Sequence, residues 1–161
     1  MRLKLKDPIP EAKIFQIISG DLKELGIKEV LGQNKIILFG LPGAFTSTCS
    51  KLHLPGYVNN VNKIKEKGID KIFCISVNDP YVMHAWGEAN NVSNKIIMLA
   101  DPYLSFTKLI GAEVDRNSKG MGFRSSRYAM IIDNLEVQKI QVEQETKNCS
   151  ISSAENILNL I

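Results

Sequence analysis

Cys49 is the residue of this sequence best placed to do chemistry. It follows an apolar run, 36–39, a chain-breaking pair, Pro42-Gly43, and a short polar turn, and the pattern becomes helical after it. The free N–H groups of a first helical turn would point at a sulfur in this position. Cysteine thiols at helix N-termini or beside cations ionise more readily, and the thiolate is the nucleophile. Cys49 is therefore a candidate reactive thiol.

Three further residues could complete a site around Cys49. Thr46 lies three residues earlier, and its hydroxyl could donate to the sulfur or to a bound oxygen substrate. Pro42 could shape the loop and shield the sulfur from bulk water. A distant arginine would hold the anion, and the candidates are Arg127, which opens a predicted strand, and Arg124. Each of these residues also has a purely structural interpretation. Cys49 could be inert packing, Thr46 a cap residue and Pro42 a turn residue. Arg127 could be one half of a surface ion pair worth well under about 1 kcal/mol.

The remaining cysteines and histidines are widely spaced. Three cysteines without a signal peptide argue against a structural disulfide framework, and Cys74, in a predicted buried strand, is expected to pack in the core. His53 is expected at the surface or at an interface, and His84 is expected to be exposed, whereas Trp86 should be core. No CxxC or HxxxH pair occurs, so no metal site is expected.

The composition is that of an ordinary globular protein. The 161 residues, 44% hydrophobic and 23% charged, predict a single domain spanning 1–161 with a real core. No apolar run approaches the roughly 20 residues of a membrane-spanning helix, and the basic segment 1–6 has no apolar stretch behind it, unlike a secretory signal. The net charge of +3 is mild and scattered, which disfavours nucleic-acid binding. We expect a cytoplasmic protein without a membrane partner.

Short apolar runs predict the strands that must position these residues. Lys35–Phe39 has the continuous β-branched and apolar character of a strand buried on both faces. The other predicted strands are 12–18, 71–77, 96–99 and a hairpin of 128–132 and 137–142. Residues 1–10 are expected to be extended, 118–124 to be a loop, and 21–30 to be a short helix or a loop with a turn.

Capping signals predict the helices. The helix after Cys49 should stop at Gly68, a C′ residue. Asp79-Pro80 and Asp101-Pro102 each combine an N-cap with a proline at the first helical position. Ser152 and Glu155 form a capping-box pair before a short terminal helix.

The order of these elements indicates the fold class. Strands and helices alternate before a late hairpin and a last helix, which suggests a βαβ core with antiparallel additions. The sequence therefore predicts an α/β protein with a central mixed sheet flanked by helices, and a thioredoxin-like fold fits this order.

Several segments resemble one known family. They are PGAFTSTCS with KLHLPGY (42–57), CISVNDPYVMHAW (74–86), LADP (99–102) and RSSRYAMIIDN (124–134). Together they are similar to the peroxiredoxins, single-domain redoxins, and more narrowly to the type-5 (atypical) subfamily, over nearly the whole chain after residue 30. Ser47 departs from the subfamily, which usually has proline there. The position supplies no catalytic group, so we expect no loss of activity. Without the proline the unfolded chain is less restricted, so we expect a free energy of unfolding lower by up to about 1 kcal/mol.

The resemblance implies a mechanism. Cys49 would be the peroxidatic cysteine, Pro42 and Thr46 its motif partners, and Arg127 the arginine of the pocket. The thiolate would attack one peroxide oxygen, and the charge on the leaving oxygen would be stabilised by a preorganised electrostatic site made of Thr46, the Cys49 N–H and Arg127. The product, a sulfenic acid, must be resolved by a thiol. No metal, haem or flavin is implied.

The resemblance leaves three routes for resolution. Some members of the subfamily use a cysteine in the region of Cys149, and some plant-type relatives use one near Cys74. Others are reduced directly by glutathione with glutaredoxin, or by thioredoxin. The family also forms dimers through loops around the active site. The contacts expected here by resemblance are Leu41, Phe45, Tyr81 and Phe123.

Two functions of different classes follow. The first is a thiol peroxidase that reduces hydrogen peroxide and organic hydroperoxides, in peroxide detoxification and redox homeostasis. The second is a redox sensor or binding protein that keeps a reactive Cys49 without significant turnover. The joint presence of Pro42, Thr46, Cys49 and Arg127 favours the peroxidase. The absence of CxxC disfavours a general disulfide oxidoreductase.

Overall fold

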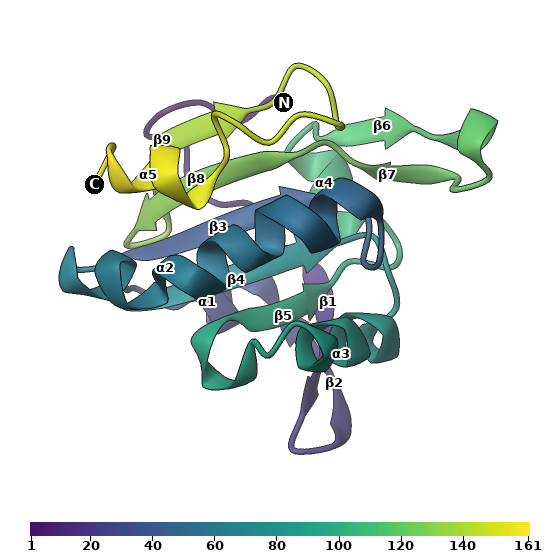
Figure 1. The fold of residues 1–161 in the computed structure, drawn as a ribbon, viewed down its shortest axis with the longest axis horizontal. Helices are drawn as coiled ribbons and strands as arrows, with labels where there is room; N and C mark the ends of the chain where they lie inside the picture. The colour runs from purple at the N-terminus through teal and green to yellow at the C-terminus, as the bar shows by residue number, and fades with distance from the viewer.

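A seven-stranded sheet forms the centre of the computed structural model, which describes residues 1–161 (Figure 1). Its strands are β1 (Lys13–Ile18), β2 (Asp21–Gly26), β3 (Ile36–Leu41), β4 (Lys71–Ser76), β5 (Ile97–Ala100), β8 (Tyr128–Asp133) and β9 (Glu136–Val142). The spatial order is β2-β1-β5-β4-β3-β8-β9, with β3, β4 and β5 parallel and the other pairs antiparallel. A separate two-stranded ribbon pairs β6 (Glu113–Asp115) with β7 (Phe123–Ser125).

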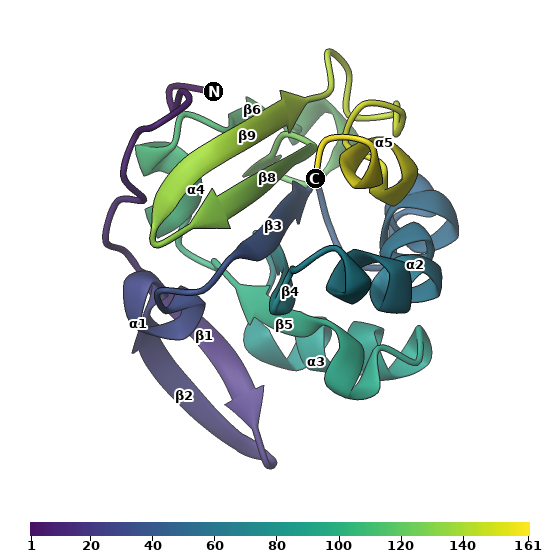
Figure 2. The same ribbon diagram turned by 90° about the vertical axis from the view of Figure 1, so that its left-hand side faces the viewer.

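Helices cover both faces of the sheet. They are α1 (Ile27–Leu31), α2 (Leu54–Glu66), α3 (Pro80–Ala89), α4 (Ser105–Leu109) and α5 (Ala154–Leu158). Three single turns add to them: η1 (Cys49–His53), η2 (Ser93–Lys95) and η3 (Asn117–Lys119). The helices α2, α3 and α5 lie on one face, and α1 and α4 lie on the other (Figure 2). None of the helices has the length and apolar character needed to cross a membrane.

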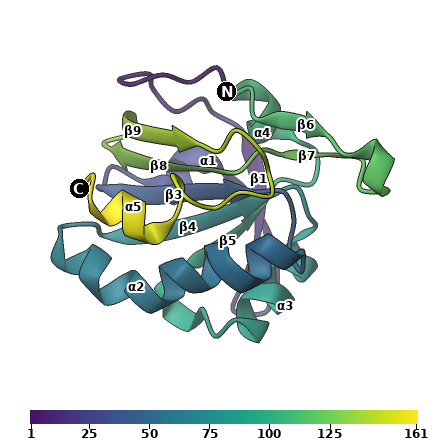
Figure 3. The same ribbon diagram turned by 45° about the horizontal axis from the view of Figure 1, so that its top comes forward.

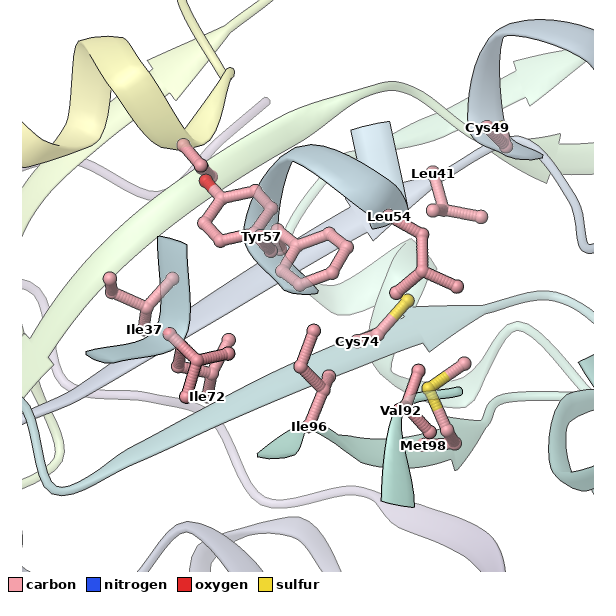
Figure 4. Close-up of a cluster of buried hydrophobic side chains, with 14 of the residues drawn as sticks. Ile37, Leu41, Cys49, Leu54, Tyr57, Ile72, Cys74, Val92, Ile96 and Met98 are labelled. Atoms are coloured by element: carbon pink, nitrogen blue, oxygen red, sulfur yellow. The ribbon is translucent and has the colours of Figure 1, made fainter. Parts of the chain in front are cut away.

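Alternation along β3 builds two cores at once. Ile37 and Phe39 point toward α2, whereas Ile36 and Leu38 belong to the cluster on the opposite face. On the α2 side, Tyr57 stacks on Phe39 with ring centroids 4.1 Å apart. Figure 4 shows this cluster, with Cys49 at one end of it. The expectation of a strand buried on both faces is confirmed, and it explains why this strand can hold the site rigidly.

Most of the predicted elements are confirmed. The four predicted strands and the hairpin agree with β1, β3, β4, β5, β8 and β9 to within a few residues, and the sheet is mixed and flanked by helices. Gly68 follows α2 with φ of 86°, as a C′ residue should. Asp79 caps α3, because its carboxylate accepts from the Val82 N–H at 2.9 Å. Trp86 is fully buried and His84 is exposed, as expected.

Two expected loop segments contain strands. Residues 21–30 form β2 and α1, because Asp21–Gly26 pairs with β1 along its full length across a tight turn at Ser19-Gly20. This edge strand is largely exposed, so it lacks the apolar alternation that would have marked it. Residues 118–124, expected to be a loop, contain part of η3 and the first two residues of β7.

The Asp101-Pro102 signal was wrong about where the helix starts. The helix α4 begins at Ser105, not at Pro102. The buried Asp101 carboxylate reaches forward and accepts from the N–H groups of Phe106 and Thr107, at 3.3 and 2.8 Å. The aspartate therefore satisfies helical N–H groups, but from a position outside the helix.

The capping box at Ser152 and Glu155 was also wrong. The N-cap of α5 is Ser153, whose hydroxyl accepts from the Asn156 N–H at 3.2 Å. Ser152 is buried and donates its hydroxyl proton to Glu143 instead. This tertiary contact cannot be read from the local pattern.

Gly40 provides a test of the packing between β3 and β8. A Cβ at this position would overlap the buried ring of Tyr128, its partner in the sheet register. Gly40→Ala should therefore lower the free energy of unfolding by about 1–3 kcal/mol, measured by denaturant titration. In the control Gly56→Ala, on α2, the nearest atom would be 4.0 Å away, and the helix should gain about 0.5–1 kcal/mol. Equal stability of the Gly40 variant and the wild type would contradict this packing.

Candidate active site

The chain between β3 and η1 positions Cys49. After Leu41 ends the strand, Pro42 and Gly43 turn the chain away from the sheet. The N–H of Ala44 donates to the side-chain oxygen of Asn78 at 3.0 Å, which ties this loop to the loop after β4. Cys49 then opens the single turn η1, so the predicted strand-to-helix transition places it as expected.

The turn η1 is a π-turn, and its sequence explains why. The N–H of Leu54 donates to the Cys49 carbonyl, five residues back. Pro55 has no N–H, so it cannot donate to the Lys51 carbonyl as an ordinary α-helix would require. A wider turn accommodates the proline, and such turns are frequent at functional sites.

Arg127 reaches Cys49 from the residue before β8. Its side chain is buried, with 1% exposed, and its Nη2 lies 3.3 Å from the Cys49 sulfur. Nη1 lies 3.0 Å from Nδ1 of His53, and Nε and Nη2 donate to the Thr146 carbonyl at 3.2 and 2.9 Å. Two segments of the chain, η1 and the loop at Thr146, thus fix one guanidinium.

The charge of Arg127 has no carboxylate partner. An arginine side chain stays protonated in proteins, and none of the ion pairs in the structure includes Arg127. Its other partners, an imidazole and a carbonyl, are dipoles. A buried charge is stable only when it is compensated, and a thiolate at Cys49 would be the counter-ion within reach. The sulfur is therefore the one group in contact with Arg127 that could supply a compensating negative charge.

His53 belongs to this site, so the expectation that it lies at the surface or at an interface was wrong. It is 1% exposed, and its Nε2 lies 3.1 Å from the Ser152 carbonyl. A carbonyl only accepts, so Nε2 carries the proton and Nδ1 accepts from Arg127. Burial, together with the Arg127 charge, lowers the pKa of His53 to about 3, which keeps the ring neutral. The spacing of four residues from Cys49 was the one signal in the sequence.

Thr46 and Pro42 line a pocket of about 220 Å³ together with Arg127. The Thr46 hydroxyl donates to the Gly43 carbonyl at 2.8 Å, so the expected donation to the sulfur is not what the structure shows. Rotation of the hydroxyl would free its proton for a bound oxygen. The structure therefore brings three of the predicted residues to one pocket, and Arg127 connects that pocket to the buried Cys49, which does not itself line it.

Arg124, the other candidate arginine, binds backbone carbonyls away from Cys49. Its Nε donates to the Met121 carbonyl at 2.8 Å, and its Nη1 donates to the Val77 carbonyl at 2.7 Å. It ties the start of β7 to the loop after β4 and makes no hydrogen bond to Cys49. Of the two candidate arginines, the structure places Arg127 at the sulfur.

The loop between β9 and α5 closes the site (Figure 3). Buried Glu143 accepts from the N–H groups of Ser150 and Ser152, at 2.7 and 2.9 Å, and from both hydroxyls. Burial opposes ionisation of Glu143, but these hydrogen bonds outweigh it and lower its pKa. The carboxylate therefore shapes the loop whose carbonyls, from Thr146 and Ser152, hold Arg127 and His53.

Comparison with known proteins decides the family. The Redoxin family model matches residues 4–158. The chain is 41% identical over 156 residues to peroxiredoxin-2D of Arabidopsis thaliana, covering 96% of each. The structure matches reduced Prx3 of Vibrio vulnificus in complex with hydrogen peroxide, with 44% identity, 98% of each chain and a TM-score of 0.93. It also matches peroxiredoxin 5 of Alvinella pompejana, with 34% identity, 98% and 96% coverage and a TM-score of 0.86.

The chain is a peroxiredoxin of the redoxin family. Its likeness to a peroxiredoxin 5 supports the type-5-like assignment made from the sequence. The predictions of a thioredoxin-like fold and of a thiol peroxidase enzyme are thereby confirmed.

The other two cysteines of the peroxiredoxin lie in different surroundings. All three cysteines are free thiols. Cys149 is half-buried in the loop after β9, and burial raises its pKa, with Arg127 opposing that effect. Cys74 is fully buried on β4, beside Leu54 in Figure 4, and burial raises its pKa well above the ordinary value. The structure thus places Cys149 in a loop that contacts the site, and Cys74 in the core.

Of the four residues expected to contact a partner chain, one is buried and three are exposed. Leu41 is fully buried, so the expectation that it contacts a partner was wrong: as the last residue of β3, it points into the core. Phe45, Tyr81 and Phe123 are exposed by 59%, 62% and 47%. These three apolar side chains are free to meet a second chain.

The buried neutral His53 predicts how stability depends on pH. The unfolded chain binds a proton at His53 below about pH 6.5, whereas the folded chain does so only near pH 3. The free energy of unfolding should therefore fall as the pH drops from 6.5, by up to about 1.4 kcal/mol per pH unit. His53→Gln keeps a donor and an acceptor but does not titrate, so its stability should change less between pH 6.5 and 5.

Denaturant titrations at several pH values measure this slope. His84→Gln is the matched control, because it removes the other histidine, which is exposed and lies outside the site. Most carboxylates titrate below this window, so they contribute little to it. If His53→Gln kept the wild-type slope, the ring would not be held neutral by its surroundings.

Proposed function

We propose that Cys49 is the peroxidatic cysteine, which reduces hydrogen peroxide and organic hydroperoxides to water and alcohols, and that Pro42, Thr46 and Arg127 form its pocket. The observation that carries this proposal is the 3.3 Å contact between the buried Arg127 guanidinium and the Cys49 sulfur. Further support comes from the relative Prx3 of Vibrio vulnificus, whose structure is described as a complex with hydrogen peroxide.

The proposed first step is a displacement at oxygen. The Cys49 thiolate attacks the terminal oxygen of the hydroperoxide, the S–O bond forms and the O–O bond breaks. The leaving alkoxide or hydroxide takes up a proton from water to give an alcohol or water. Arg127 and the Cys49 N–H stabilise the charge on the leaving oxygen, and Thr46 donates to it once its hydroxyl turns from Gly43. The sulfur is left as a sulfenic acid.

We propose Cys149 as the resolving thiol. Cys49 is fully buried, so a thiol on a molecule much larger than a peroxide reaches its sulfur only if the first helical turn opens. The loop that carries Cys149 is bonded to that turn, because the Thr48 hydroxyl donates to the Lys147 carbonyl at 3.3 Å. Attack of the Cys149 thiol on the sulfenic acid forms a disulfide and releases water. Glutathione with glutaredoxin, or thioredoxin, then reduces the disulfide. Cys74 is the alternative partner.

A homodimer in the cytoplasm completes the proposal. Exposed Phe45, Tyr81 and Phe123 are the proposed contacts, since burial of their exposed apolar surface against a partner would be favourable. The cytoplasm keeps thiols reduced, which suits the proposed reductants. Relatives named chloroplastic, from Arabidopsis thaliana, and mitochondrial, from Oryza sativa, make organelles the alternative.

Turnover of hydrogen peroxide tests the role of Cys49. Cys49→Ser should reduce consumption to the rate without protein, with dithiothreitol, with glutathione plus glutaredoxin, and with thioredoxin. Cys74→Ser should retain the wild-type rate with dithiothreitol, because this core thiol takes no part in the first step. Undiminished turnover in Cys49→Ser would overturn the assignment.

Mass spectrometry after one equivalent of peroxide tests the resolving step. The wild type should contain a disulfide-linked peptide pair of Cys49 and Cys149. Cys149→Ser should instead gain one oxygen, as a lasting sulfenic acid trapped by a dimedone-type reagent. A Cys49–Cys74 disulfide, or the same sulfenic acid in the wild type, would contradict the role of Cys149 without affecting that of Cys49.

A further inference from the structure

In the pocket that Pro42, Thr46 and Arg127 line, every charged lining residue is a cation. Its charged lining residues are Arg116, Lys119, Arg127 and Lys147. None of the ten residues that line it is an aspartate or a glutamate. Only Arg127 is needed at the sulfur, so three cations around the opening have no part in the chemistry proposed above.

Two of these three cations are not neutralised by a neighbour. Lys147 forms an ion pair with Glu145, with Nζ 2.8 Å from a carboxylate oxygen. Lys119 is exposed and makes no ion pair in the structure. Arg116 donates from Nη2 to the Thr146 hydroxyl, while its Nε is buried without a hydrogen-bond partner.

The cations around the pocket come from two parts of the chain. Arg116 follows β6 and Lys119 ends η3, so both lie in the connection between β6 and β7. Lys147 lies in the loop after β9. Figures 1 and 3 show the loop after β9 approaching this ribbon. Thr146 joins the two, since its hydroxyl accepts from Arg116 and its carbonyl accepts from Arg127. The cationic opening and the sulfur site therefore share one structural residue.

We propose that this opening is a subsite for the carboxylate of an anionic organic hydroperoxide, an inference that rests on the peroxidase function proposed above. The hydroperoxide group lies at Thr46 and Arg127, and the carboxylate lies at Arg116 and Lys119. The volume of about 220 Å³ is below the roughly 300–1,000 Å³ of drug-sized sites, so the substrate is compact.

The pocket suits the peroxide better than the reductant. It is present while the Cys49 sulfur is reduced and fully buried, which is the state that meets a peroxide. A thiol reductant meets the sulfur only after the first turn has opened. The reaction is unchanged by the subsite: S–O forms, O–O breaks, and the carboxylated alkoxide takes a proton from water and leaves as the hydroxy acid.

Rates of single-turnover oxidation test the subsite. The probes are cumene hydroperoxide and the same molecule with a ring carboxylate, each mixed with the reduced full-length protein. The wild type should prefer the carboxylated probe, and Lys119→Gln and Arg116→Gln should each lower that preference by about two- to fivefold. Lys95→Gln, an exposed lysine outside the pocket, removes the same charge and should leave the ratio unchanged. Added salt should weaken the wild-type preference.

The possible outcomes separate this inference from the function it rests on. Peroxidase activity with equal ratios in the wild type and in Lys119→Gln would overturn the subsite and leave the peroxidase intact. No reaction of the wild type with either probe or with hydrogen peroxide would instead remove the proposed function. A last experiment compares the rates at which anionic glutathione and neutral dithiothreitol reduce the oxidised wild type and the oxidised variants. If the variants slowed only the glutathione step, the cations would serve the reductant and the assignment to the peroxide would be wrong.

Discussion

The buried positive charge of Arg127 is the constraint on which this site depends. A guanidinium cannot discharge itself by losing a proton, so every group around it must compensate its charge or accept its hydrogen bonds. The protein provides a sulfur, a neutral imidazole and one carbonyl that accepts twice. Of these, only the sulfur belongs to a group that forms an anion by losing a proton. The positive charge of Arg127 is therefore available to stabilise negative charge at Cys49, where the chemistry is proposed to occur.

The loop after β9 has two tasks that conflict. Through Thr146 and Ser152 it holds Arg127 and His53 in place for the attack on peroxide. The same loop carries Cys149, which must move toward Cys49 if it is to resolve the sulfenic acid. Under this proposal the loop would release Arg127 only after oxidation. The four hydrogen bonds that Glu143 accepts from Ser150 and Ser152 then set how easily it does so.

The sequence was sufficient for the parts of the molecule that local pattern determines. Apolar runs located the buried strands, and Asp79 and Gly68 marked helix ends through backbone preferences that act within one turn. The motif around Cys49, with Arg127 far along the chain, located residues that the fold does bring together. The exposed edge strand β2 was missed because it has no buried face of its own to impose alternation.

The remainder depends on partners that lie far away in sequence. His53 was expected at the surface or at an interface because a preformed thiolate needs no base, whereas its two partners are the Ser152 carbonyl and Arg127. Ser152 looked like a cap because the local spacing fits one, but buried Glu143 competes for its hydroxyl. Thr46 donates to the Gly43 carbonyl, three residues back in the same turn, and not to the sulfur. Such choices are made by tertiary packing, which no local spacing encodes.

The central claim is that Arg127 acts on the Cys49 sulfur and that the groups around it, His53 among them, hold it there; a double-mutant cycle tests this most directly. The rate of Cys49 oxidation by hydrogen peroxide would be measured in the wild type, His53→Leu, Arg127→Gln and the double variant. Trp86 is a natural probe, because its indole donates to Ser50, next to Cys49, at 3.0 Å. His53→Leu should slow oxidation by about ten- to a hundredfold in the wild type and hardly at all in Arg127→Gln. An equal loss in both backgrounds would show that His53 acts independently of Arg127 and would contradict the account.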